Sequence, residues 1–279
     1  MAGKLLTCGW ESMSRSRQIL AAVLAATMLL SGGCRKKEGK SELILAGSTS
    51  VQPFVEMVAE KYMEELPEMR VIVQGGGSTA GVQAVREGAA AIGMSSRCLT
   101  AQETDLTPIT LARDGIAVIV HPSNGVGNLT VEQVREIFGG RIRDWKEVGG
   151  KPGRIWLVTR EEGSGTRGAF KELVMHKTQI VPEAIVQDSN GSVRAVIADF
   201  PMGIGYVSLG LVDETVKALR IDGVVASRDN VKNKSYRLVR PFLFLVKGEP
   251  QAQAKQFIDF VLSERGQKLL EEESLIGAH

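Results

Sequence analysis

The residues best suited to chemistry are hydroxyl side chains in three glycine turns, each between an expected strand and an expected helix. These turns are Gly47-Ser48-Thr49-Ser50, Gly77-Ser78-Thr79 and Gly163-Ser164-Gly165-Thr166. A helix N-terminus carries about four unpaired N–H groups and roughly half a positive charge, so added hydroxyl donors make an anion site there. Ser and Thr are also ordinary N-caps, so one such turn alone indicates only capping. Three of them predict an oxyanion site.

Two arginines directly after expected strands supply the charge that such a site needs. Arg97 follows the strand expected at residues 90–95, and Arg160 follows the strand expected at residues 155–159. A guanidinium offers a planar fork of donors that suits an oxyanion. The alternative for Arg160 is a surface ion pair with Glu161 or Glu162.

Strands and helices must alternate to position these turns, and the hydrophobic periodicity predicts that they do. The expected strands are residues 41–47, 70–74, 90–95, 116–121, 155–159, 204–207, 224–226 and 237–246. Helices follow each turn, capping boxes are expected at Thr100/Glu103 and Thr130/Gln133, and one long helix is expected over residues 251–273. This alternation predicts an α/β fold with parallel sheets covered by helices, and Pro241 suggests an edge strand or a crossover. Ligands of such sheets bind at the carboxyl ends of the strands, where the turns lie.

The first 33 residues read as an export signal rather than as part of the fold. Residues 19–30 are an unbroken run of twelve apolar or small residues, too short to span a membrane as a helix, and Arg15 and Arg17 precede them. Small residues then lead to Cys34, which resembles a bacterial lipoprotein signal with an acylated cysteine. Ser31 departs from that pattern, which usually has an aliphatic residue three before the cysteine. The alternative is an ordinary cleaved signal with an incidental Cys34.

Composition excludes several classes of function. Removing residues 1–33 takes away three of the 34 basic residues and one of the 32 acidic ones, which leaves 31 of each. A neutral chain lacks the basic excess of a nucleic-acid binder. Cys34 and Cys98 are the only cysteines left, so neither a disulfide framework nor a cysteine-rich metal site is expected. Residues 34–40 hold four basic residues and form a tether that suits lipid headgroups.

The motifs around the turns resemble one family along nearly the whole mature chain. The matching segments are GSTSVQP, GGGSTAGV, IGMSSR, TREEGSGTR and GIGYVSLG. They resemble the phosphate-binding component of bacterial phosphate ABC transporters, in its short, lipoprotein-like branch. The resemblance implies a two-lobed, periplasmic-binding-protein-like fold of type II that closes over one phosphate. It also implies a monomeric, lipid-anchored, extracytoplasmic protein that serves an ABC permease, without catalysis, cofactor or metal.

The resemblance assigns roles to particular residues. Thr49 would give a hydroxyl and Ser50 an N–H group, while Ser78 would cap its helix onto the anion. Arg160, Ser164, Gly165 and Thr166 would hold the anion from the other lobe. Many members have an aspartate where Ser96 stands, so Ser96 and Arg97 are expected to set which oxyanion is preferred.

The expected lobes divide the chain in three pieces. Residues 41–120 and 240–279 would form the first lobe and residues 121–239 the second. The two crossings near residues 120 and 240 would form the hinge, with the ligand between the lobes.

Other functions stay open at this stage. The bound oxyanion could be sulfate or molybdate. An NADP-dependent enzyme is a further alternative, because Gly75, Gly77 and Ala80 fit G-x-G-x-x-G/A with Arg97 about 20 residues on; the export signal argues against it. Ser164 has Glu162 where a serine hydrolase has glycine. His121 and His176 lie in no motif, and a purely structural or sensor lipoprotein would need no convergent anion turns.

Overall fold

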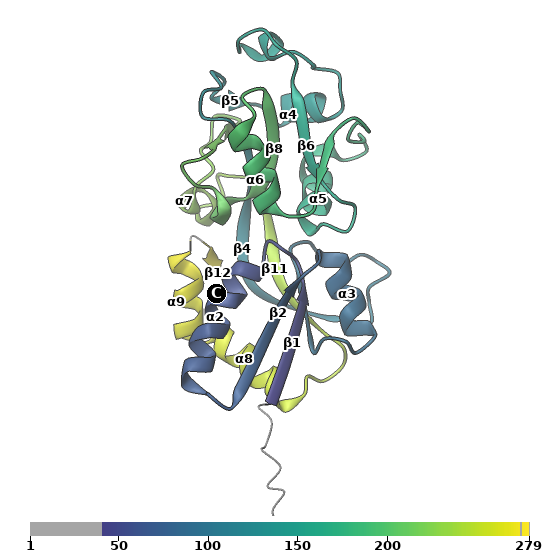
Figure 1. Ribbon diagram of the computed structural model, residues 1–279, viewed down its shortest axis with the longest axis vertical. Helices are drawn as coiled ribbons and strands as arrows, with labels where there is room; N and C mark the ends of the chain where they lie inside the picture. The colour runs from purple at the N-terminus through teal and green to yellow at the C-terminus, as the bar shows by residue number, and fades with distance from the viewer. Residues whose placement is uncertain (1–40, 274, 279) are drawn as a thin grey trace, which may run out of the picture. The chain divides into compact units, whose positions relative to one another are not determined.

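Strand, glycine turn and helix recur along the chain as the local sequence predicts. The computed structural model describes residues 41–273 and 275–278, so the predicted signal, Cys34 and the basic tether lie outside the described residues. The strands are β1 (Ser41–Gly47), β2 (Met69–Gly75), β3 (Ile92–Ser95), β4 (Thr107–Val120), β5 (Asn128–Leu129), β6 (Trp156–Arg160), β7 (Ile185–Gln187), β8 (Gly203–Ser208), β9 (Lys217–Ala218), β10 (Arg220–Ile221), β11 (Val239–Val246) and β12 (Ile276–Gly277). The helices are α2 (Gln52–Glu65), α3 (Ser78–Arg86), α4 (Val131–Phe138), α5 (Gly165–Phe170), α6 (Asn190–Asp199), α7 (Arg228–Lys232), α8 (Ala252–Leu262) and α9 (Glu264–Glu272) (Figure 1).

One continuous path of strands runs through the fold in the order β2-β1-β3-β11-β4-β8-β6-β7. β1 is parallel to β2 and β3, and β6 is parallel to β7 and β8, as the strand–helix alternation predicts. The centre differs, because β11 is antiparallel to β3 and β4, and β4 is antiparallel to β8. β4 carries the chain one way and β11 brings it back, so these neighbours must run in opposite directions.

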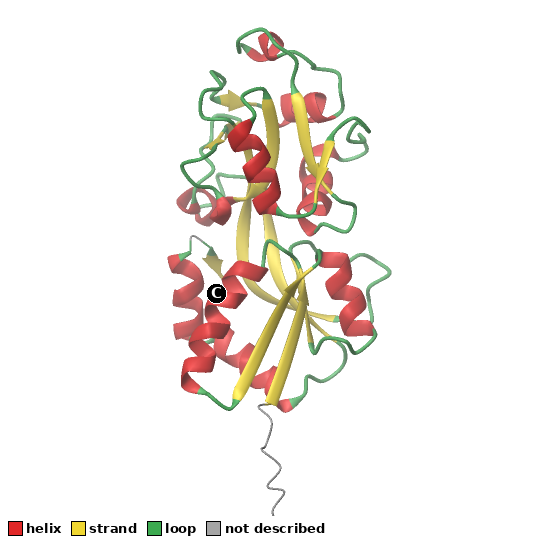
Figure 2. Ribbon diagram, in the orientation of Figure 1, coloured by secondary structure: helices red, strands yellow, loops and turns green. Residues whose placement is uncertain are grey.

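Two large apolar cores define two lobes, and a smaller cluster that includes Val82 and Leu245 adds to the first. The core of the first lobe is built around Leu45 and Phe257, and the core of the second lobe around Phe138 and Tyr206. β4 contributes to both, with Leu111 and Ala112 in the first core and residues 116–120 in the second. Figure 2 shows β4 and β11 running from one lobe into the other, with helices beside the strands of each lobe. The α/β, two-lobed architecture is confirmed.

Local sequence explains where the helices begin. Thr130 caps α4 in a complete capping box with Gln133, as predicted. α3 begins after Gly77, whose φ of 89° lies in the left-handed region that favours glycine. α5 continues into a π-helical turn over Lys171–Met175.

Some of the expected elements are wrong. The C-terminal helix is two helices, because Ser263 has an extended ψ of 160° and its side chain caps α9 by accepting from the Gly266 N–H. Residues 224–226 form no strand, and Val224 makes only an isolated bridge to Ile221. No helix follows Thr100 in the described chain; residues 101–105 form turns.

β11 is not an edge strand, but Pro241 lies where the strand can tolerate it. Pro241 pairs with Arg113 of β4, whereas pairing with β3 covers only residues 243–245. The missing N–H of Pro241 therefore costs no bond to β3. The interpretation as a crossover fits this geometry, and a register shift follows between Phe242 and Leu243.

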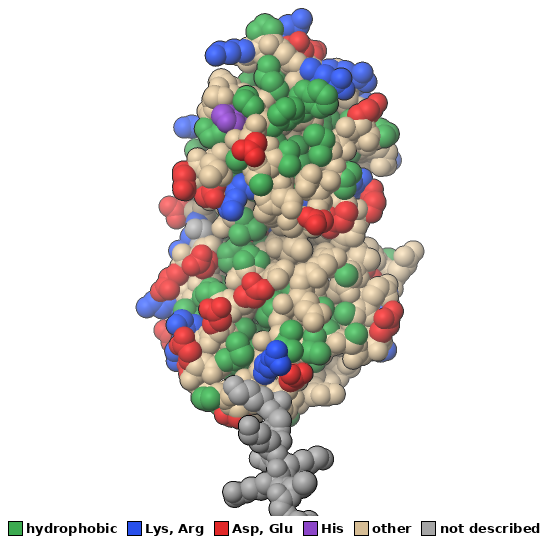
Figure 3. All heavy atoms as spheres, viewed as in Figure 1, with side chains coloured by type: hydrophobic (Ala, Val, Ile, Leu, Met, Phe, Trp, Pro, Cys, Tyr) green, Lys and Arg blue, Asp and Glu red, His purple; other side chains and the backbone are tan. Residues whose placement is uncertain are grey.

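Figure 3 shows acidic and basic side chains interspersed on the face in view, without separation by sign. Within the described residues, no helix combines the length and the apolar character that crossing a bilayer requires.

Candidate functional site

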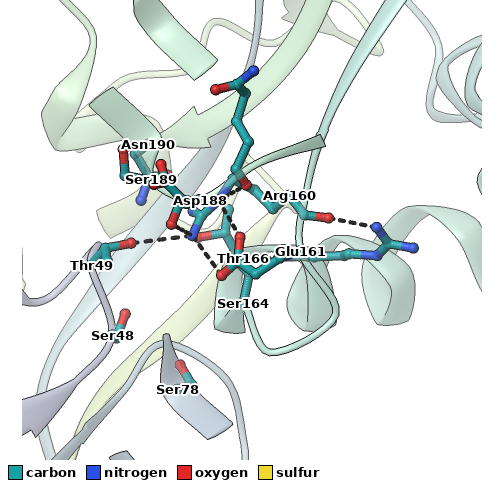
Figure 4. A network of polar contacts seen from close by, with 12 residues as sticks. Ser48, Thr49, Ser78, Arg160, Glu161, Ser164, Thr166, Asp188, Ser189 and Asn190 are labelled. Carbon is teal, nitrogen blue, oxygen red and sulfur yellow. Dashed lines mark hydrogen bonds and ion pairs between the residues drawn. The ribbon is translucent and has the colours of Figure 1, made fainter. Parts of the chain in front are cut away.

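The three glycine turns meet at one place, where the two lobes face each other (Figure 4). β1 leads through its turn to α2, β2 leads to α3, and β6 leads to α5. A fourth junction, from β7 to α6, joins them through Asp188, Ser189 and Asn190. The hydroxyl-rich segments therefore converge as the sequence predicts.

The first lobe contributes a chain of buried hydroxyls. The Ser48 hydroxyl donates to Ser96 Oγ at 2.8 Å, and the Ser96 N–H donates to Ser78 Oγ at 3.0 Å. The Ser50 N–H donates to Ser48 Oγ at 3.2 Å. Each of these serines is at most 2% exposed. Hydroxyls can donate or accept, so this layer can adapt to an anion's oxygens.

The second lobe lies directly on that layer. Ser50 Oγ and Thr166 Oγ1 are hydrogen-bonded across the lobes at 2.8 Å, and the Thr79 N–H donates to the Gly163 carbonyl at 3.1 Å. A Cβ atom on Gly165 would clash with Ser78 Oγ and would lie 2.5 Å from Ser96 Oγ. Only glycine therefore allows this approach.

Arg160 is the buried charge of the site, with 1% of its surface exposed. Its Nη2 donates to Thr49 Oγ1 at 3.2 Å, to the Asp188 carbonyl at 2.8 Å and to Glu161 Oε1 at 3.0 Å. Its Nε donates to Glu161 and to the Gln187 carbonyl. Nη1 has no hydrogen-bond partner among the residues that the structure describes. An unpaired buried donor costs free energy, about 1–3 kcal/mol or more when charged, so the site is suited to an acceptor.

Ser164 acts on α5 itself. Its Oγ accepts from the Arg167 N–H at 3.2 Å, which caps the helix. Arg167 Nη1 in turn donates to the Arg160 carbonyl at 2.5 Å. These two bonds fix the turn that presents Gly165 and Thr166.

The structure does not bring Arg97 into this cluster. Its guanidinium forms two parallel bonds of 2.8 Å with the Glu103 carboxylate and one of 2.9 Å with the Cys98 carbonyl. Glu103 also accepts from the Thr100 N–H at 2.7 Å. Thr100 and Glu103, whose spacing predicts a capping box, thus lie in a turn instead. Glu103 of this turn holds the Arg97 guanidinium away from the hydroxyl cluster.

The Arg97–Glu103 pair predicts how stability depends on acid. The hydrogen bonds that Arg97 donates lower the pKa of the Glu103 carboxyl from 4.5 to about 2, and the bond from the Thr100 N–H lowers this pKa further. The pair should therefore stabilise the fold fully above pH 4.5, and this contribution should fall as the pH drops toward 2. Glu103→Gln should lower the free energy of unfolding at pH 7 by about 1–3 kcal/mol and flatten its fall below pH 4.5.

Urea unfolding between pH 7 and pH 3 checks this expectation. Glu162→Gln is the matched control, because Glu162 also pairs with an arginine but its side chain is 73% exposed. It should change the free energy of unfolding by no more than about 0.5 kcal/mol. Parallel pH curves for wild type and Glu103→Gln would contradict the prediction.

Sequence reasoning missed three residues of the site: Asn190, Asp114 and Arg240. Asn190 Nδ2 donates to Ser50 Oγ at 2.8 Å, and its Oδ1 accepts from the Ser208 N–H at 3.1 Å. Arg240 Nη1 donates to Thr166 Oγ1 at 2.8 Å. For Asp114 and Arg240, the available signal was a charged residue within a largely apolar segment that forms a strand. For Asn190, it was the serine at position 189, which caps α6.

Chemically, the cluster is a set of donors built for a compact anion. Two guanidinium groups, four serine hydroxyls, two threonine hydroxyls and helix N-termini converge on it, and the carboxylates of Glu161 and Asp114 are paired with Arg160 and Arg240. His121 Nδ1 is hydrogen-bonded to Ser123 Oγ, and within the described part of the chain its ring makes no hydrogen bond to this cluster.

Known proteins are similar to this chain in sequence and in fold. The model of the PBP superfamily domain matches residues 35–265. The phosphate-binding protein PstS of Bacillus subtilis is 35% identical, with 92% of each chain covered. A Clostridium perfringens protein, described as a phosphate ABC transporter substrate-binding protein with bound phosphate, has a TM-score of 0.83 and 40% identity, over 86% of this chain and 100% of its own.

A second solved structure agrees. The ABC-type phosphate transport receptor of Vibrio cholerae is 40% identical, with a TM-score of 0.72 over 84% of this chain and 99% of its own. Because the family model matches residues 35–265 and a 35% identical relative is matched over 92% of each chain, this protein belongs to the PBP superfamily and, within it, to the phosphate-binding proteins of ABC transporters typified by PstS.

Proposed function

We propose that this protein binds inorganic phosphate outside the cytoplasm and delivers it to the permease of an ABC transporter. The observation that carries the proposal is the buried Arg160, whose Nη1 has no partner among the described residues and which lies amid hydroxyls from both lobes. Although Glu161 pairs with Arg160 through Nε and Nη2, the remaining N–H donors of Nη1 and the neighbouring hydroxyls suit a compact anion. The named functions of the relatives support the same ligand.

The proposed phosphate contacts come from both lobes. Arg160 supplies the charge, and Gly165 supplies a backbone N–H at the start of α5. Hydrogen bonds to a charged group contribute about 1.5–3 kcal/mol each, so seven or more support micromolar or tighter binding after the cost of lobe closure. Arg97 is left out of this set because Glu103 occupies its guanidinium. The full set is Thr49, Ser50, Ser78, Ser96, Arg160, Ser164, Gly165 and Thr166.

We further propose that the lobes are residues 41–120 with 240–279, and residues 121–239, hinged where β4 and β11 cross between them. The separate apolar cores support a division into two lobes, but they favour a first crossing at residues 113–115 rather than near residue 120, because residues 116–120 pack in the second core. One chain, acting as a monomer, would close over one ion.

Catalysis is not part of the proposal. A nucleotide pyrophosphate would have to approach the α3 turn, but the Thr79 N–H already donates to the Gly163 carbonyl. A Cβ atom on Gly77 would lie 2.9 Å from that same carbonyl oxygen, so the second lobe covers the turn. Other oxyanions are the nearer competitors, because Ser96 offers a hydroxyl rather than a carboxylate.

Isothermal titration of the mature protein with phosphate, sulfate, molybdate and arsenate tests the function. We expect one phosphate per chain with micromolar or tighter affinity, and weaker binding of sulfate and molybdate. Absence of heat and of a thermal shift at millimolar phosphate would refute the proposal. Tighter binding of sulfate or molybdate would instead assign the site to that anion.

Membrane attachment is proposed to depend on a lipid on Cys34. Cys34→Ala should abolish labelling by a clickable fatty acid and release the protein from the membrane fraction, because the acyl chains of a lipoprotein supply the anchoring energy. Cys98→Ala is the matched control, since Cys98 is an exposed free thiol within the fold, and it should change neither readout. Unchanged membrane association of Cys34→Ala would contradict the proposed anchor.

A further inference from the structure

A buried ion pair joins the two strands that cross between the lobes. Asp114 of β4 and Arg240 of β11 are direct partners in the antiparallel ladder. Arg240 Nε and Nη2 donate to Asp114 Oδ2 at 3.0 and 2.9 Å, and both side chains are 1% exposed. Two charges buried between separate apolar cores are weak evidence for stability, because their desolvation offsets most of their attraction.

The remaining donors of Arg240 reach the proposed phosphate site. Nη1 donates to Thr166 Oγ1 at 2.8 Å and approaches the Ser96 carbonyl at 3.5 Å. One guanidinium therefore contacts the hinge strands, the first turn of α5 in the second lobe and the end of β3 in the first lobe. Its Cζ lies over the Phe242 ring, 5.3 Å from the ring centroid, within the range of a cation–π contact.

Counting hydrogens around Thr166 shows what this contact does. Thr166 Oγ1 accepts from Arg240, and Ser50 Oγ accepts from Asn190 Nδ2 at 2.8 Å. The two hydroxyls share a single hydrogen bond with each other. Each hydroxyl carries one hydrogen, so the pair has one hydrogen more than that bond uses. Arg240 Nη1 and Asn190 Nδ2 can only donate, so neither can accept the remaining hydroxyl hydrogen. That hydrogen is therefore available to another acceptor.

We propose that Arg240 is a positioning residue for the bound anion: by donating to Thr166 it turns a hydroxyl hydrogen of the Ser50–Thr166 pair onto the anion. Asp114 holds the guanidinium in place and partly neutralises it. This inference rests on the proposed phosphate function and adds a second cation, behind the hydroxyls, to the one that Arg160 supplies directly.

Replacing Asp114 and Arg240 by uncharged residues distinguishes a role of Arg240 in anion binding from a role in stabilising the fold. Asp114→Asn removes the negative charge beside Arg240 but keeps a side-chain oxygen that can accept from its guanidinium, so the contact with Thr166 remains and phosphate affinity should be several-fold tighter than in wild type. Asp114→Asn combined with Arg240→Gln removes both charges without leaving either buried alone, and should weaken phosphate binding by about 10- to 100-fold. Asp114→Asn with Arg240→Lys should recover part of the affinity. Melting of each ligand-free variant shows whether it is folded.

The energetic coupling between Arg240 and Thr166 in phosphate binding gives a second test, because a purely structural role of Arg240 would not change the effect of a Thr166 substitution. Thr166→Val should weaken phosphate binding clearly in the Asp114→Asn background and by less than about twofold in the Asp114→Asn/Arg240→Gln background. If the neutral pair does not fold, Arg240→Lys alone takes its place, with a partial loss of coupling expected, because lysine restores only part of the contact.

Two results would overturn the inference. One is equal phosphate affinity in Asp114→Asn and Asp114→Asn/Arg240→Gln; the other is an equal effect of Thr166→Val in both backgrounds. A wild-type protein that binds no phosphate would refute the proposed function and this inference with it. Normal binding by wild type with an unaffected double variant would refute the inference alone.

Discussion

Arg160→Ala is expected to weaken phosphate binding by about 100-fold or more, because it removes a full charge and at least one direct donor from a desolvated site. Water can replace a lost hydroxyl in part, but it cannot replace a guanidinium. The effect should therefore exceed that of Thr49→Ala, which removes one half-buried hydroxyl. Isothermal titration of both variants with phosphate measures the difference.

Arg97→Ala is the matched control for that experiment. Arg97 is also an arginine after a strand and also pairs with a glutamate, but it lies outside the hydroxyl cluster. Its loss should leave phosphate affinity within about twofold of wild type while lowering the melting temperature, because Glu103 loses its partner. A larger loss of phosphate binding in Arg97→Ala than in Arg160→Ala would reverse the assignment of the charge.

Gly165→Ala is expected to reduce phosphate affinity by about 100-fold or more, because closure would drive the new methyl group into two serine hydroxyls. A Cβ atom there would clash with Ser78 Oγ and lie 2.5 Å from Ser96 Oγ. The separate lobes should still fold, so the ligand-free melting temperature should change little. Small-angle scattering should show that phosphate no longer compacts the variant.

Gly163→Ala distinguishes this steric block from a general effect of stiffening the turn. Gly163 lies in the same turn, but its Cβ atom would meet only Thr79 Cβ at 3.7 Å, an ordinary contact. This variant should bind phosphate within a few-fold of wild type and should still compact. Equal losses in the two variants would argue against closure as the source of the Gly165 effect.

Local sequence was sufficient to predict the strand–helix junctions and the site's main charge. Glycine, hydroxyls and apolar periodicity lie within about 15 residues of each other, so β1 and β2 were predicted to within one residue, and α2 and α3 follow their turns as expected. Arg160 was found because it precedes a turn whose glycines and hydroxyls already indicate an anion. The alternation also gave the parallel halves of the sheet, but not its antiparallel centre.

Local sequence patterns could not predict which residues from distant segments contact each other. Arg97 and Arg160 look alike in sequence, and what separates them is a carboxylate: Glu103 occupies both arms of Arg97, whereas Glu161 leaves Arg160 Nη1 unpartnered among the described residues. Asp114 and Arg240 lie 126 positions apart and become neighbours only when β4 and β11 pair. The break at Ser263 was missed although the sequence offers a signal: the apolar run ends at Leu262, and a capping serine opens the polar stretch of residues 263–268.

The way the strands are shared between the lobes has a consequence for the order in which the chain can fold. The second lobe's strands β6, β7 and β8 come from one continuous stretch, so their contacts close short loops. The first lobe must wait for β11, which pairs with β3 after about 150 intervening residues, and for α8 and α9 beyond it. Closing that longer loop costs more chain entropy and slows folding. During synthesis from the N-terminus, the first lobe to emerge is therefore the last to be completed, and β1 and β2 remain without their full core until the end of the chain arrives.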